Sequence, residues 1–144
     1  MFRRIVAAYN ESPESQRALN TAIRLAASLQ AELHTVTAAE ALPAYTAFAA
    51  VGDPSLPREL KQDRLRVYQE LQEKARVQVQ GHGIELENHL VEGQPVEAII
   101  EFLRRQRADL LVIGLHPHDI HIARLWSTVY ELAQEAPCSV LGVH

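Results

Sequence analysis

The C-terminal part of the sequence carries the pattern best suited to chemistry. An apolar run from Leu110 to Ile113 ends in Gly114, and Ser127 and Thr128 then open a helical pattern. A strand that ends in a glycine and leads to a helix start is typical of a turn that binds phosphate. The spacing is close to that of a nucleotide loop, G-x2-G-x9-G-S/T, but Pro117 and Ser127 stand at two of its glycine positions. The sequence therefore predicts a phosphate-binding turn with fewer backbone donors.

Pro117 and Ser127 change what such a loop can do. Proline fixes φ and has no N–H to donate to a phosphate oxygen, whereas glycine would permit positive φ and close backbone approach. Serine is small, and its hydroxyl can donate a hydrogen bond or cap the helix. We therefore expect this loop to hold the phosphates of a nucleotide weakly or not at all.

The same loop is rich in histidine. His116, His118 and His121, with Asp119 among them, could supply a nitrogen-rich site for zinc or nickel. No matching cluster appears elsewhere in the sequence, so we interpret the segment as an exposed polar loop and predict no metal site. A third alternative is that His116 and Arg124 bind an anion as cations. Binding would then depend on pH, because His116 must be protonated to carry a charge.

Composition limits the classes of protein to which the chain can belong. A chain of 144 residues with 47% hydrophobic content is expected to form a single domain spanning residues 1–144. The net charge of −4 and the lack of a basic stripe argue against nucleic acid as a partner. Cys138 is the only cysteine, and no apolar run has the length of a membrane span, so we expect a cytoplasmic protein without disulfides.

Hydrophobic periodicity predicts five strands that alternate with four helices. A strand buried on both faces is expected at Ile5 to Tyr9, and further strands at Leu33 to Thr37 and Leu110 to Ile113. A half-exposed edge strand is expected around Ile84 to Leu90, and an apolar outer strand at Ser139 to Val143. Ser12-Pro13 and Gln94-Pro95 are start signals for two helices. A long charged helix is expected from Pro57 to Gln80, with Leu60, Val67, Leu71 and Ala75 inward and Gly81 or Gly83 as its stop.

This alternation predicts the α/β class, with a doubly wound, Rossmann-like parallel sheet, helices on both faces and strand order 3-2-1-4-5. In such sheets, ligands bind at the carboxyl ends of the strands, near the point where strand order reverses. The candidate site therefore combines the segment from Tyr9 to Ser12 with the loop that begins at Gly114. The segment from Ala38 to Ser55 is long enough to cover this site, to form a dimer surface or to remain a mobile loop.

Four segments together resemble the universal stress protein family. Ile-Val-Ala-Ala-Tyr-Asn-Glu-Ser at 5–12 is similar to the family opening, and Val-Glu-Gly-Gln-Pro at 91–95 resembles a later family segment. Ala-Asp-Leu-Leu-Val-Ile-Gly at 108–114 and Ala-Pro-Cys-Ser-Val-Leu at 136–141 are similar to its last two strands. The resemblance covers the whole chain, and it rests on the order and spacing of these segments.

The resemblance implies a set of nucleotide-contacting residues, because some family members bind ATP through the loop described above. Asn10 stands where the family usually has aspartate, Glu11 where it has glycine, and Tyr130 where it has serine or threonine. The phosphates would lie at the helix start and the base near Tyr9 and Val36. The full set of candidate residues is Tyr9, Asn10, Val36, Gly114, His116, Ser127, Thr128 and Val129.

Two functions follow from the resemblance. The first, which we prefer, is a stress-response regulatory protein with a degenerate nucleotide loop, paired as a homodimer through Ser139 to Val143. The alternative is a sensor of ATP or another adenine nucleotide that uses the loop from Gly114 to Thr128. We predict that the protein is not an enzyme, because no nucleophile elbow, Walker lysine loop or GxGxxG motif occurs. Slow ATP hydrolysis as a side activity stays open.

Overall fold

The computed structural model describes residues 1–39, 51–115 and 128–144. The strands are β1 (Arg4–Ala8), β2 (Glu32–Ala39), β3 (Leu86–Glu92), β4 (Leu110–Gly114) and β5 (Ser139–Val143). The helices are α1 (Pro13–Leu29), α3 (Leu56–Val79), α4 (Pro95–Gln106) and α5 (Thr128–Glu135). No helix within these three ranges is long and apolar enough to cross a membrane.

The strands form one parallel sheet in the order β3-β2-β1-β4-β5, which confirms the predicted class and strand order. β1 lies at the centre, hydrogen-bonded to β2 on one side and to β4 on the other. Its residues Ile5, Val6 and Ala7 are fully buried, as expected for a strand that is covered on both faces. β3 and β5 are the two edges.

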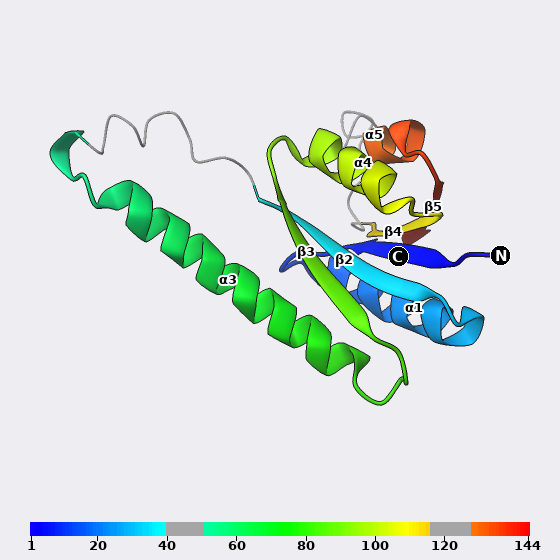
Figure 1. The fold of residues 1–144 in the computed structure, drawn as a ribbon. Helices are drawn as coiled ribbons and strands as arrows, with labels where there is room; N and C mark the ends of the chain where they lie inside the picture. The colour runs from blue at the N-terminus through cyan, green and yellow to red at the C-terminus, as the bar shows by residue number, and fades with distance from the viewer. Residues whose placement is uncertain (40–50, 116–127) are drawn as a thin grey trace.

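Helices cover both faces of the sheet. α1 and the C-terminal half of α3 pack on one face, and α4 and α5 pack on the other (Figure 1). α4 places apolar residues at helical spacing on the side that faces the sheet, and these are buried: Val96, Ile99, Ile100 and Leu103. Phe102 on the same helix is also buried.

The helix starts and stops agree with the sequence signals. The hydroxyl of Ser12 accepts a hydrogen bond from the backbone N–H of Ser15, which caps α1 one residue before Pro13. Gly81 adopts a φ of +83° just after α3, a conformation that glycine reaches without steric cost. The β3 strand begins soon afterwards, as the expected edge strand.

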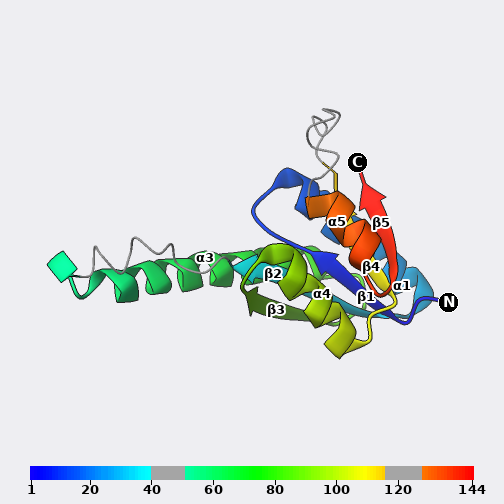
Figure 2. The same cartoon turned by 90° about the horizontal axis from the view of Figure 1, so that it is seen from above.

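α3 differs from its prediction at its N-terminal half. Leu71 and Ala75 are buried, but Val67 is 43% exposed, so the prediction that Val67 faces the core was wrong. The reason is visible in two views, since α3 runs well past the end of the sheet and its first turns have no strand surface to cover (Figures 1 and 2).

Gly114, at the end of β4, lies against the first turn of α1. A Cβ atom placed on Gly114 would lie 2.7 Å from the Cβ of Glu14 and still closer to the Glu14 carbonyl group. Because the neighbouring atoms are backbone, they cannot swing aside. This glycine is therefore required by the packing of β4 against α1, whatever its role toward a ligand.

We predict that Gly114→Ala destabilises the fold by about 2 kcal/mol, because the added methyl group must push α1 away from β4. Chemical denaturation measures the free energy of unfolding. Gly52→Ala is the matched control, since a Cβ atom at Gly52 meets no atom within 4 Å. Equal stability of both variants and the unmodified protein would contradict the packing argument.

Candidate functional site

The turn between β1 and α1 is held by a compact set of hydrogen bonds. The buried hydroxyl of Ser15 accepts from the backbone N–H of Asn10 at 3.1 Å and donates to the Asn10 carbonyl oxygen at 2.8 Å. The side-chain oxygen of Asn10 accepts from the backbone N–H of Ser12 at 2.8 Å. Asn10 is therefore fixed at the carboxyl end of β1. The N–H groups of its side-chain amide take no part in the hydrogen bonds of this turn.

A pocket of about 590 Å³ opens beside Asn10. It lies between the carboxyl ends of β2 and β3 and the projecting part of α3. Its apolar surface comes from Ala38 and Ala39 on β2, Leu90 on β3, and Leu65 and Leu71 on α3. This volume is in the range of small-molecule sites, and the pocket lies at the carboxyl ends of the strands, where doubly wound sheets bind ligands. It lies beside β2 and β3, however, and not at the predicted point between β1 and β4. Of the candidate residues that the structure describes, Asn10 alone lines it.

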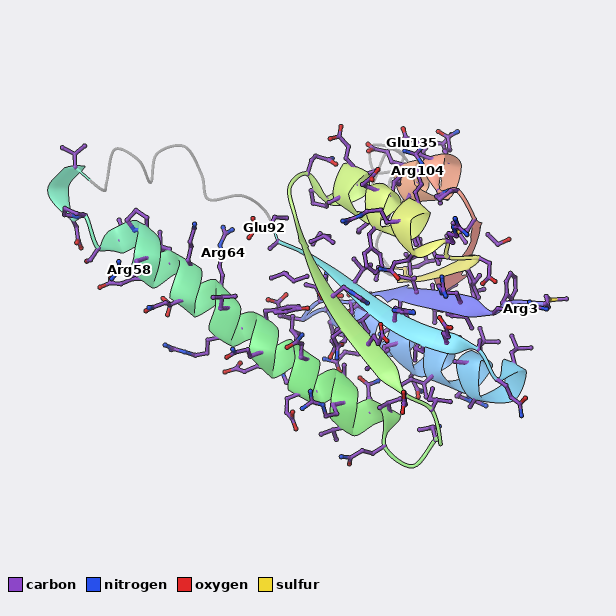
Figure 3. The ribbon with its side chains drawn as sticks, viewed as in Figure 1. Arg3, Arg58, Arg64, Glu92, Arg104 and Glu135 are labelled. Atoms are coloured by element: carbon purple, nitrogen blue, oxygen red, sulfur yellow. The ribbon has the colours of Figure 1, made fainter. Side chains whose placement is uncertain are left out.

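Charged side chains of both signs border this pocket. Lys61 and Arg64 come from α3, while Glu11 follows β1 and Glu92 ends β3. Figure 3 shows Arg64 and Glu92 on the two sides of the space between α3 and the sheet. The cations can attract an anionic ligand, and the carboxylates limit how much negative charge it can carry.

Tyr9 and Val36, proposed from the family resemblance to lie near a base, are brought together but are buried. The backbone N–H of Tyr9 donates to the Val36 carbonyl oxygen at 3.0 Å. The side chain of Tyr9 packs in the core between the sheet and α1, and Val36 packs on the opposite face. The Tyr9 hydroxyl has no hydrogen-bond partner among the described residues, and burial raises its pKa.

The remaining candidate residues lie between the end of β4 and the start of α5. Gly114 is part of the β4–α1 contact, and the backbone of Thr128 begins α5, as the sequence predicts. Val129 packs against the core on the α4 side of the sheet. His116, Ser127 and the other residues of the histidine-rich loop, His118 and His121, lie outside the described residues, so these assignments stay predictions.

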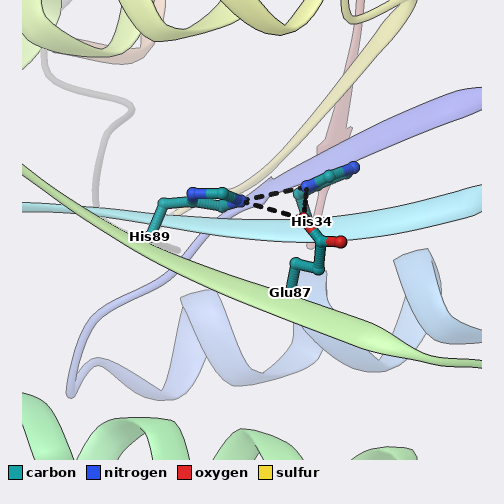
Figure 4. Close-up of side chains that lie close together, drawn as sticks. All are labelled: His34, Glu87 and His89. Atoms are coloured by element: carbon teal, nitrogen blue, oxygen red, sulfur yellow. Dashed lines mark hydrogen bonds and ion pairs between the residues drawn. The ribbon is translucent and has the colours of Figure 1, made fainter.

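A second group of polar side chains was missed by the sequence analysis. His34 on β2 and Glu87 and His89 on β3 bring two imidazoles and a carboxylate together (Figure 4). In the sequence these three residues form no cluster that matches the histidine-rich loop, and only the fold brings them together. The signal is the strand register, which pairs His34 with Glu87 and Val36 with His89 and so places all three side chains on one face.

The electrostatics of this group are set by burial and by its neighbours. The pKa of His89 is lowered, first by burial and then by His34. Glu32 accepts a hydrogen bond from Arg4 at 2.7 Å, and this contact lowers the pKa of the Glu32 carboxyl.

Cys138 lies apart, partly buried against the core, and burial raises the pKa of its thiol, which favours the unreactive form.

Comparison with known proteins gives consistent results. Residues 1–144 match the sequence model described as the universal stress protein family. A universal stress protein of Thermus aquaticus is 33% identical over 146 residues, covering 99% of each chain, and one of Methanocaldococcus jannaschii is 26% identical over 99% of this chain and 82% of its own. A crystal structure of a universal stress protein in complex with cAMP is 26% identical, with a TM-score of 0.77 and coverage of 99% and 97%.

We predict that Tyr9→Phe leaves stability unchanged or raises it by up to about 1 kcal/mol, because it removes a buried hydroxyl that has no partner in the described structure. Thermal and chemical denaturation measure the change. Tyr68→Phe serves as the comparison, since the Tyr68 hydroxyl interacts with Gln72. A clear loss of stability for Tyr9→Phe would show that the hydroxyl has a partner.

Proposed function

The chain belongs to the universal stress protein family, and on that premise we propose that it is a cytoplasmic, non-enzymatic stress-response regulator. Its ligand is an adenine nucleotide with a single phosphate group, such as AMP or cAMP. The pocket beside Asn10 is the observation that carries the proposal. ATP is bound weakly or not at all, because its β- and γ-phosphates would depend on a loop in which Pro117 offers no N–H.

The lining of the pocket suits the parts of such a nucleotide. Ala38, Ala39 and Leu90 provide an apolar surface for a flat base. The amide nitrogen of Asn10, whose side-chain oxygen is already bonded to Ser12, is left to donate to a ribose hydroxyl or a phosphate oxygen. Lys61 on α3 supplies a positive charge at the rim of the pocket.

The balance of charges favours a ligand of low charge. Glu11 and Glu92 line the same pocket as Lys61 and Arg64, so the cations are offset by carboxylates. A cyclic or simple monophosphate carries one or two negative charges, whereas a triphosphate carries more and needs dedicated donors. The relative solved with cAMP, at 26% identity, supports the same ligand class.

Homodimer formation through β5 is a second proposal with its own support. β5 is an edge of the sheet, and within the described chain it pairs with β4 alone. Its Leu141 side chain is 36% exposed. An edge strand that carries an exposed aliphatic residue is a ready surface for pairing with a second copy.

We predict saturable binding of cAMP or AMP that is tighter than binding of ATP, measured by isothermal titration and by the rise in Tm. Ala39→Phe is expected to weaken binding of the monophosphates at least tenfold, because the ring occupies the pocket. Ser28→Phe, at an exposed position near the end of α1, is the control and should bind normally. Absence of a saturable response to every nucleotide, or an unaltered response in Ala39→Phe, would overturn the proposal.

We predict that the protein is a dimer and that Leu141→Lys makes it monomeric, because a charged side chain on an edge strand opposes pairing between copies. Sedimentation velocity over a range of concentrations measures the molecular mass. Leu29→Lys changes a similarly exposed leucine at the end of α1 and should leave the dimer intact. A monomeric unmodified protein, or a Leu141→Lys dimer of unchanged affinity, would refute pairing through β5.

A further inference from the structure

We propose that His34, Glu87 and His89 form a binding site for one zinc ion on the α4 face of the β2–β3 edge (Figure 4). This site is separate from the nucleotide pocket, which opens on the α3 side, and from the histidine-rich loop. Its support is the arrangement of the three donor atoms, together with the side chains that surround them.

The backbone holds the three residues in a fixed relation. β2 and β3 are parallel neighbours, and their register places His34 directly opposite Glu87. His89 lies two residues further along β3, and side chains two residues apart in a strand point to the same face. The site therefore rests on two hydrogen-bonded strands, which hold ligands more firmly than a loop does.

The three donor atoms form a triangle that fits a tetrahedral metal. Nδ1 of His34 lies 3.0 Å from Nε2 of His89 and 3.4 Å from Oε2 of Glu87, and the third side is 3.7 Å. Zinc bonds of about 2.0–2.2 Å at tetrahedral angles separate neighbouring donors by about 3.3 Å. The circle through the three atoms, fixed by these sides, has a radius of about 2.0 Å, so an ion near its centre reaches all three at bonding distance.

The two facing ring nitrogens are suited to share a cation. In the absence of an ion, a hydrogen bond between two neutral imidazoles requires one nitrogen to carry the proton and the other to accept it. An ion bound between them would use the lone pairs of both nitrogens, and that proton would move to the outer nitrogen of its own ring, so that both imidazoles stay neutral. The carboxylate of Glu87 then offsets one of the two positive charges of the ion.

Neighbouring side chains orient the ligands as metal-binding histidines are usually oriented. Nε2 of His34, the nitrogen not used for the ion, lies 3.6 Å from Oε2 of Glu32. A carboxylate near this outer nitrogen, at ion-pair and not hydrogen-bond distance, favours the tautomer that carries the proton there and leaves the inner nitrogen free. Glu32 is itself held by Arg4, and the ring of Phe102 on α4 packs against His89 with centroids 4.8 Å apart.

Burial differs across the site in a way that permits entry. The His34 side chain is only 7% exposed, whereas that of Glu87 is 70% exposed. His34 and Glu87 also line an open pocket of about 560 Å³, through which solvent can reach the site. The ion would thus have three protein ligands and a water molecule in the fourth position.

The donor set selects the class of metal. Two imidazole nitrogens and one carboxylate oxygen suit zinc and the later first-row metals, whereas magnesium and calcium prefer oxygen ligands alone. Because the triangle fits tetrahedral bonds, we assign zinc. Copper(II), which binds nitrogen and oxygen sites strongly but favours square-planar geometry, is the natural competitor.

The test is a zinc titration of chelator-treated, dialysed protein by calorimetry, with Tm recorded in parallel. We expect one zinc ion per chain and a saturable rise in Tm. His89→Ala and Glu87→Gln should each weaken binding at least about 100-fold, because loss of even an outer-shell partner costs roughly 10–100-fold. Substitution of cobalt(II) should give the visible spectrum of tetrahedral coordination, which a purely structural role for these residues would not produce.

Matched variants separate this site from other histidines. His82→Ala and Glu85→Gln remove exposed residues in the approach to β3 and should bind zinc normally. A triple variant with alanine at His116, His118 and His121 should also keep the binding. Lack of zinc binding by the unmodified protein, retention of affinity in His89→Ala and Glu87→Gln, or loss of affinity only in the triple loop variant would each overturn the proposal.

Discussion

The pairing of β1 with both β2 and β4 is the constraint on which the rest of the structure depends. β1 is completely buried at its centre and runs parallel to both neighbours. The carboxyl ends of β1, β2 and β4 therefore lie together at one end of the sheet. At that edge Asn10 is anchored by Ser15, and Gly114 lets β4 approach the first turn of α1. The turn that borders the pocket is therefore shaped by core packing before any ligand is considered.

The register between β2 and β3 adds two surfaces to this centre. On the α3 face, the ends of these strands carry Ala39 and Leu90 and complete the pocket beside Asn10. On the α4 face, nearer their beginnings, they carry the donor triangle of His34, Glu87 and His89. One pair of strands thus supports two chemically different sites, because alternate side chains point to opposite faces.

Local patterns in the sequence predicted most of the fold. Ser12-Pro13 and Gln94-Pro95 mark helix starts by chemistry that acts within a few residues, and α4 has the periodicity of a helix with one buried face. The placement of Val67 failed because periodicity reports which residues share a face, and not how far the sheet extends beneath them. The length of α3 relative to the strands is a property of the whole fold.

The sites were less predictable than the fold, for a related reason. The position of Asn10 at a strand end follows from topology, but the contribution of Lys61 and Arg64 depends on where α3 lies. His34 and His89 are 55 residues apart in the chain and meet only through the β2–β3 register. Gly114 fits a nucleotide motif in the sequence, whereas the structure also gives it a packing role against Glu14.

The central claim is that the pocket at the carboxyl ends of β1, β2 and β3 receives an adenine monophosphate. The most direct measurement is a two-dimensional ¹H–¹⁵N NMR titration of the assigned protein with cAMP. The account predicts saturable shift changes concentrated in the backbone amides of Asn10, Ala39 and Leu90, with little change on the far side of α4. An unchanged spectrum, or changes confined to a different surface, would contradict it.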